Sequence, residues 1–179
     1  MIDIFLAEGF EEIEALCPLD LMRRAGLEVQ TVGVGSKMIK GAHGITVEAD
    51  ITVSEYTPHG SDMIFLPGGM PGTLNLAACD TVISAIKDAV ASDKYIAAIC
   101  AAPSILGDMG LLEGKEAICY PGFEDRLTGA KISERRVVRD GRMITAAGMG
   151  VALDLGLEIV KLFCGEQKAA ELRSAVIAD

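Results

Sequence analysis

A single thiol stands where a strand and a helix are expected to meet. Residues 95–107 read YIAAICAAPSILG, in which an apolar run predicts a buried strand over residues 95–99 and Cys100 follows directly. A residue at such a turn is often held in strained dihedrals, with its side chain projecting over the sheet edge. The N-terminus of the helix that follows would favour the reactive thiolate. We therefore expect Cys100 to be a nucleophile, although a cysteine can also simply fill a tight space.

Two glycines end another apolar run and add to this candidate site. Residues 62–69, DMIFLPGG, predict a buried strand that runs into Gly68 and Gly69. Because glycine lets the backbone approach a ligand closely, the amides of Gly69 and Ala101 could form an oxyanion hole over Cys100. A tight turn before a helix would explain the same glycines, and both interpretations stay open.

The elements that would position these residues alternate between strand and helix. Strands are expected at residues 2–7, 28–34, 45–53, 62–69, 95–99 and 116–120, a β-hairpin at 135–148, and helices at 11–26, 81–93, 102–110 and from 151 to the end. Such alternation predicts one α/β domain over residues 1–179, with a mostly parallel sheet covered on both faces. Ligands of such folds bind beyond the carboxyl ends of the strands. The loops of interest therefore follow Ala7, Leu66, Ile99 and Cys119.

The helix expected over residues 11–26 carries two further signals. Its apolar residues recur at helical spacing, at Ile13, Leu16, Leu19 and Met22. Gly26 is typical of a C-terminal cap, and Pro18 predicts a kink or a junction between two helical pieces.

The composition indicates a soluble globular protein and excludes two classes of partner. Half of the 179 residues are hydrophobic, and the formal net charge is −10. A surface so acidic disfavours sequence-independent binding to nucleic acid and docking on anionic lipid. The N-terminal residues lack the basic region and cleavage site of a signal peptide, and no apolar run reaches the roughly 18–20 residues that span a bilayer. We expect a cytoplasmic protein without a membrane partner.

The cysteines and glycines give no sign of a metal or nucleotide. The five cysteines are odd in number and widely spaced, unlike a zinc site or a secreted disulfide framework. Met38 and Leu153 stand where the third glycine of a dinucleotide-binding motif would be needed. We therefore expect neither a metal nor a cofactor.

Three segments together resemble one known family. "LPGG", "AAICAAP" and "EEIEALCPLDLMRRAG" are similar to the ThiJ/PfpI superfamily, in the branch of the Parkinson-disease deglycase and its bacterial relatives, over essentially the whole chain. The resemblance implies a flavodoxin-like three-layer sandwich, similar to class I glutamine amidotransferase domains. It also implies a cofactor-free homodimer.

The resemblance also assigns roles to particular residues. It implies that Cys100 is the nucleophilic or redox cysteine, that Glu14 is its acidic partner, and that the amides of Gly69 and Ala101 are the oxyanion donors. A carboxyl beside a thiolate is expected to stay protonated, to donate a hydrogen bond to sulfur and to move protons during turnover.

Without the resemblance, Glu14 could not be distinguished from its neighbours. Glu11 and Glu12 stand in the same segment, and both are expected to be solvated helix residues. The same solvated position is the alternative interpretation of Glu14.

One position departs from the family pattern. The family often has a histidine shortly before a proline in the strand beyond the cysteine, and here that position is Tyr120. Tyrosine, with a pKa of about 10, is a poor general base at neutral pH. The two histidines, His43 and His59, are expected on the surface. Tyr120 and Gly68 are therefore expected to line the pocket, and a Cys–Glu pair remains as the reactive unit.

A Cys–Glu pair suits small electrophilic carbonyls better than amides, because a thiolate adds to an aldehyde without expelling an amine. The sequence thus predicts an enzyme of the glyoxalase or deglycase type, which acts on a small carbonyl substrate such as methylglyoxal or on a glycated protein. A redox sensor or stress chaperone with Cys100 oxidised to a sulfinate is the first alternative. A cysteine amidase or protease-like hydrolase is the second.

Overall fold

Seven strands form a central sheet in the computed structural model, which describes residues 1–58 and 60–178. The strands are β1 (Ile2–Leu6), β2 (Val29–Gly33), β5 (Ile51–Thr52), β6 (Met63–Leu66), β7 (Tyr95–Ile99), β10 (Val137–Asp140) and β11 (Met143–Ala146). Their order across the sheet is β10-β11-β7-β6-β1-β2-β5. Every neighbouring pair is parallel except the hairpin β10–β11. The structure confirms the mostly parallel sheet.

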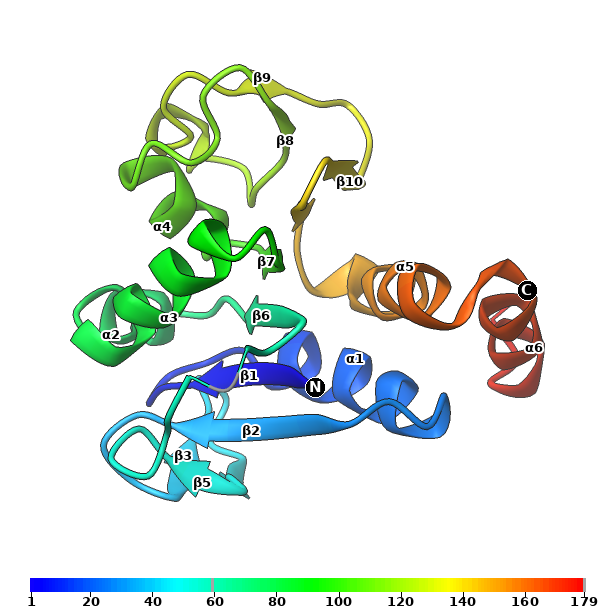
Figure 1. Ribbon diagram of the computed structural model, residues 1–179, viewed down its shortest axis with the longest axis horizontal. Coiled ribbons are helices and arrows are strands. Elements are labelled where there is room, and N and C mark those ends of the chain that lie inside the picture. The colour runs from blue at the N-terminus through cyan, green and yellow to red at the C-terminus, as the bar shows by residue number, and fades with distance from the viewer. Residues whose placement is uncertain (59, 179) are drawn as a thin grey trace.

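Helices cover both faces of this sheet, which makes a three-layer sandwich (Figure 1). One face is covered by α1 (Glu12–Arg24), α5 (Ala152–Cys164) and α6 (Glu166–Ala175), and the other by α2 (Gly72–Ala77), α3 (Asp80–Ala91) and α4 (Pro103–Asp108). Strands buried on both faces read as continuous apolar runs rather than alternating patterns. This is why IDIFL in β1 and MIFL in β6 are buried at every position.

Small peripheral elements complete the fold. β3 (Met38–Lys40) and β4 (Thr46–Glu48) form an antiparallel hairpin, β8 (Glu116–Ala117) pairs with β9 (Lys131–Ile132), and η1 (Glu124–Arg126) and η2 (Met149–Val151) are 3-10 turns. The strand expected over residues 116–120 is therefore wrong in two respects, because β8 ends at Ala117 and lies outside the central sheet. The loop that contains Tyr120 does not follow a central strand.

Helix α1 runs through Pro18 without a break, so a junction between two helical pieces is wrong and a kink stays a prediction. The helix packs closely on α5 at Gly156, where an added Cβ would lie 3.0 Å from the Cα of Pro18 and 2.7 Å from a side-chain carbon of Leu21. Tertiary contact at this crossing compensates for the backbone hydrogen bond that proline cannot make. Gly26 has a φ of +83° and caps the helix as expected.

The buried face of α1 differs from the one that its apolar spacing suggests. Ala15, Pro18, Leu21 and Met22 are buried, whereas Ile13 is 48% exposed. The polar residues Glu12 and Glu14 are also buried on this helix. The face that α1 turns inward thus includes two carboxyl groups.

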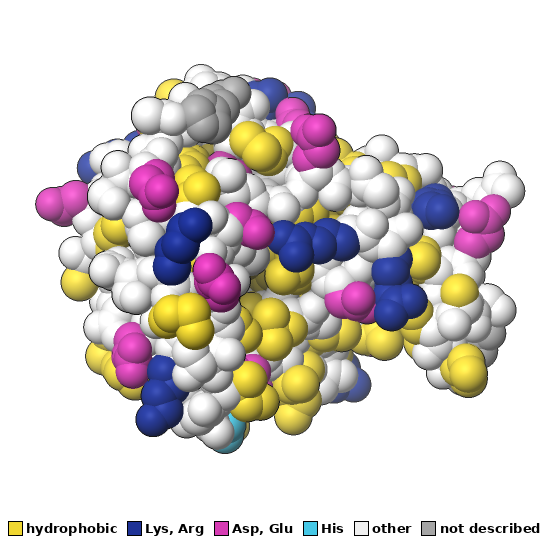
Figure 2. Space-filling view, turned by 90° about the horizontal axis from the view of Figure 1, so that it is seen from below, with side chains coloured by type: hydrophobic (Ala, Val, Ile, Leu, Met, Phe, Trp, Pro, Cys, Tyr) yellow, Lys and Arg dark blue, Asp and Glu magenta, His cyan; other side chains and the backbone are white. Residues whose placement is uncertain are grey.

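The surface is of mixed charge. Figure 2 shows one face, on which the described Lys and Arg side chains alternate with Asp and Glu side chains. No helix in the described part of the chain is both long and apolar enough to cross a bilayer.

Candidate active site

Cys100 occupies a strained backbone position at the carboxyl end of β7. Its φ is +65°, and only three described residues other than glycine have a positive φ. This region is unfavourable for a side chain with a Cβ and is often found at functional sites. Two backbone hydrogen bonds hold the residue, from its N–H to the carbonyl of Ala146 (2.9 Å) and from the N–H of Tyr120 to its carbonyl (2.8 Å). The sharp strand-to-helix turn predicted at Cys100 is confirmed.

Glu14 reaches Cys100 from the first turns of α1. The residue is 1% exposed, and its carboxyl group shares a hydrogen bond with the Cys100 sulfur. The N–H of Gly68 donates to its Oε2 at 3.0 Å, and the N–H of Met149 donates to the same carboxyl group. The structure therefore brings together a thiol and a buried carboxyl that are far apart in the sequence.

Two backbone amides converge on the same sulfur. The N–H groups of Gly69 and Ala101 both donate hydrogen bonds to it. Gly69 has a φ of +92°, and a Cβ on Gly68 would lie 2.6 Å from both the Cβ of Cys100 and the Oε2 of Glu14. Any side chain at position 68 would separate the thiol from the carboxyl. Glycine at this position therefore allows the two groups to lie close together.

The site holds one ionisable pair whose members both resist ionisation. Burial raises the pKa of the Glu14 carboxyl from 4.5 to about 7. Burial, and then the negative charge of Glu14, raise the pKa of the Cys100 thiol to about 12, against the two amides that lower it. The pKa of the thiol is therefore raised, whereas the sequence led us to expect it to be lowered.

Tyr120 lies at the rim of the site. Its side chain is 51% exposed, and a Cβ on Gly148 would lie 3.3 Å from its ring and 3.9 Å from the Oε1 of Glu14. The residue therefore stands beside the Glu14 carboxyl and not in the layer that covers the sheet. His59 lies outside the described residues.

Glu12 is not the solvated residue that the sequence suggests, because it is 2% exposed. The tip of the β3–β4 hairpin docks on it: the N–H groups of His43 (2.8 Å) and Ile45 (3.3 Å) donate to Oε1, and the exposed His43 ring contacts Oε2 at 2.9 Å. Backbone N–H groups of a docked loop need an acceptor, and Glu12 supplies it.

Among the described residues, Glu11, Glu12 and His43 could together hold a metal ion, since their ligand atoms lie within 4.8 Å of one another. The Glu12 carboxyl and the His43 ring are already bonded to each other. No signal in the sequence pairs position 12 with position 43.

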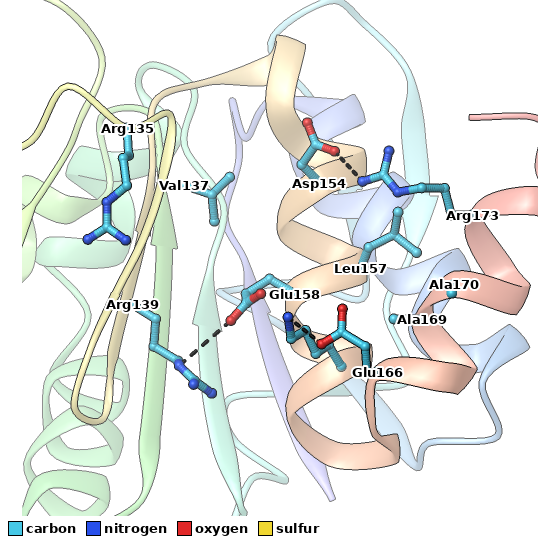
Figure 3. Close-up of a pocket in the computed structure, with 11 residues that line it drawn as sticks. Arg135, Val137, Arg139, Asp154, Leu157, Glu158, Glu166, Ala169, Ala170 and Arg173 are labelled. Carbon is cyan, nitrogen blue, oxygen red and sulfur yellow. Dashed lines mark hydrogen bonds and ion pairs between the residues drawn. The ribbon is translucent and has the colours of Figure 1, made fainter. Parts of the chain in front are cut away.

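A groove of about 560 Å³ lies away from Cys100, between β10, α5 and α6 (Figure 3). Three pairs of its charged side chains join within the groove, Arg139 with Glu158, Arg173 with Asp154 and Lys161 with Glu166, and its Arg135 pairs with Glu116 beyond it. None of the residues assigned to the Cys100 site lines this groove. The residues predicted to be catalytic therefore lie around Cys100 and not in this groove.

The fold and the site define a class of protein: a flavodoxin-like α/β sandwich with a cysteine at a strand-to-helix turn and a buried carboxyl beside it. The chain belongs to the DJ-1/PfpI family, whose sequence profile matches residues 1–162.

Individual relatives support this assignment. The chain is 35% identical to Protein DJ-1 homolog B of Arabidopsis thaliana over 96% of its own length, and it spans only 40% of that relative. It is 33% identical to the glutathione-independent glyoxalase DJR-1.2 of Caenorhabditis elegans, covering 92% of this chain and 89% of the relative. A crystal structure of a mutant DJ-1 superfamily protein from Salmonella typhimurium superposes with a TM-score of 0.94 at 32% identity, over 98% of this chain and 97% of the other.

Proposed function

We propose that this protein is a cofactor-free enzyme that acts on reactive dicarbonyls or their early adducts with amines, and so protects against carbonyl stress. One observation carries the proposal: a thiol, a buried carboxyl with a pKa of about 7 and two amide donors converge on one point. A general base works best when its pKa lies near the operating pH. The similarity to a glutathione-independent glyoxalase supports the same reaction class.

The first step on methylglyoxal would generate the nucleophile only when it is needed. The Cys100 sulfur forms a bond to the aldehyde carbon while the thiol proton moves to the Glu14 carboxylate. The carbonyl electron pair moves to oxygen, where the amides of Gly69 and Ala101 can stabilise the negative charge. Return of the proton from Glu14 to this oxygen gives a neutral hemithioacetal.

The second step would be an internal proton transfer. The Glu14 carboxylate removes the proton from the sulfur-bound carbon and delivers it to the neighbouring carbon, while the hydroxyl proton on the sulfur-bound carbon passes to the neighbouring oxygen. The product is a 2-hydroxy thioester. Water then attacks the thioester, the carbon–sulfur bond breaks, lactate leaves and sulfur regains a proton. The net reaction adds one water to methylglyoxal and needs no oxidant or reductant.

A redox sensor is the second candidate, and the same amides support it. The two N–H donors that face the sulfur would suit the oxygens of a sulfinate, and a protonated Glu14 could donate a third hydrogen bond. Amide hydrolysis has less support, because no histidine among the described residues lies against Cys100.

Turnover of methylglyoxal by the purified protein tests the enzyme. We expect lactate to form with the wild type and to be lost in Cys100→Ser and Glu14→Gln. Cys164→Ser is the matched control, because Cys164 is an exposed free thiol outside the site. Equal lactate formation in Cys100→Ser and wild type would overturn the proposal.

A further inference from the structure

One arginine has no acidic partner in the described part of the chain, whereas every other arginine has one. The chain has eight arginines, and seven of them lie within 4.0 Å of a carboxylate: Arg23, Arg24, Arg126, Arg135, Arg139, Arg142 and Arg173. Figure 3 shows two of them directed at carboxylates, Arg139 at Glu158 and Arg173 at Asp154. Arg136 alone has no such partner among residues 1–58 and 60–178. In a chain with 26 acidic and 16 basic residues, an unpaired guanidinium is the exception.

Arg136 lies at the edge of the sheet where Cys100 lies. It precedes β10, which is antiparallel to β11, so it stands beside the carboxyl end of β11. Its carbonyl accepts from the N–H of Ala147 at 2.9 Å, and its Nη2 lies 3.4 Å from the carbonyl oxygen of Gly150. The preceding residue, Met149, donates its N–H to the Glu14 carboxyl. Only the short segment 148–150 therefore separates the guanidinium from the catalytic carboxyl.

The charge that Arg136 presents is available to a ligand. A guanidinium has five N–H donors, and one long contact to a carbonyl leaves most of them free. The side chain is exposed. Helix α5 begins just after this segment, at Ala152, and its N-terminus adds partial positive charge on the same side.

We propose that Arg136 binds an anionic group of the substrate and thereby determines specificity at the Cys100 site. The inference rests on the function proposed above, because only that function gives the Cys100 site a substrate. A guanidinium recognises carboxylate and phosphate through paired N–H donors, so either group fits. The substrate class is then a 2-oxoaldehyde, or an early amine adduct, that bears a carboxylate or phosphate away from the reactive carbonyl.

Alkylation of Cys100 tests the charge effect without any turnover. Iodoacetate and iodoacetamide both form a sulfur–carbon bond as the carbon–iodine bond breaks, iodide leaves and the thiol proton passes to buffer. They differ in charge, and only iodoacetate carries a carboxylate. We expect Arg136→Gln to lower the rate ratio of iodoacetate to iodoacetamide by about three- to tenfold at low salt, and less at high salt.

Arg142→Gln is the control, since it removes the same charge from the turn of the same hairpin and Arg142 already pairs with Asp93. The control should leave the ratio close to that of the wild type. An unchanged ratio in Arg136→Gln, or an equal fall in both variants, would overturn the role of Arg136.

Turnover then tests the substrate class and separates this inference from the proposed function. We expect Arg136→Gln to lower kcat/KM for a phosphate-bearing 2-oxoaldehyde roughly tenfold relative to methylglyoxal. Inorganic phosphate should compete in the wild type if the site favours phosphate, and acetate should compete if it favours carboxylate. Equal losses on the neutral and the anionic substrate would refute the specificity role. If neither substrate is turned over while the alkylation ratio still depends on Arg136, the proposed reaction fails and the anion site stands.

Discussion

Replacing Glu14 by glutamine should stabilise the protein at high pH and inactivate it at the same time. The wild-type carboxyl has a pKa of about 7 in the folded protein against an ordinary value of 4.5. The folded state therefore holds a proton that the unfolded chain has lost between these two pH values. By linkage, this group lowers the free energy of unfolding as pH rises from about 4.5 to about 7.

The size of the effect follows from the same two values. A rise from 4.5 to about 7 corresponds to about 3 kcal/mol once the carboxyl is fully ionised. Glutamine has one oxygen, so one of the two N–H donors from Gly68 and Met149 loses its acceptor, at a cost of about 1 kcal/mol. Glu14→Gln should therefore be about 2 kcal/mol more stable than the wild type at pH 8 and about 1 kcal/mol less stable at pH 4.

Urea unfolding at a series of pH values measures this difference. Glu48→Gln is the control. Glu48 is exposed on β4, so this substitution removes the same charge from a carboxyl that is not buried. The difference in free energy of unfolding between variant and wild type should change by about 3 kcal/mol from pH 4 to pH 8 in Glu14→Gln, and it should not change in Glu48→Gln. Alkylation of Cys100 gives an independent measurement. Loss of the neighbouring negative charge should lower the pKa of the thiol, so the pH profile of alkylation in Glu14→Gln should shift to lower pH.

A stability difference that stays constant from pH 4 to pH 8 would refute the reasoning, since it would mean that burial does not raise the pKa of Glu14. A variant that keeps full turnover would show that the carboxyl only positions the sulfur.

Three further predictions probe the surroundings of the pair. Gly68→Ala should lower turnover at least about tenfold and cost about 1–3 kcal/mol in stability, because its Cβ would intrude between Cys100 and Glu14; lactate assays and urea unfolding check this, and wild-type activity would contradict it. Tyr120→His should lower the pKa of the Cys100 thiol by placing a titratable cation, with a pKa of about 6.5, at the rim; an unchanged alkylation profile would show that position 120 does not couple to the thiol. Mild peroxide should add two oxygens at Cys100 by intact mass and peptide mapping, and oxidation scattered over the eight methionines would count against the sensor.

Local patterns in the sequence predicted the strand-to-helix turn at Cys100 and located most elements. The apolar run before Cys100 and the small residues after it predicted a strand-to-helix turn, which the positive φ of Cys100 confirms. The β-hairpin predicted over residues 135–148 is likewise confirmed as β10–β11. Glu14 came only from the family resemblance, because nothing in residues 11–14 shows which carboxyl is directed inward. The homodimer, the single domain and the cytoplasmic location stay predictions.

Features that depend on distant contacts were beyond local reasoning. Glu12 is buried because a hairpin some thirty residues later docks on it. Burial and Glu14 raise the pKa of the Cys100 thiol, and the degree of burial is a property of the assembled layers. Pro18 stays within α1 because α5 packs against it.

The contact between α1 and α5 at Gly156 gives the site a dependence on residues that no substrate touches. Glu14 and Pro18 are one helical turn apart, and Pro18 rests on Gly156 with no space for a methyl group. A side chain there would displace the helix that carries Glu14, while Cys100 and the amides beside it belong to other elements and would keep their places. Natural or engineered variation at this crossing would therefore change the separation of Glu14 and Cys100, so a screen for altered activity should include the helix interface as well as the residues around Cys100.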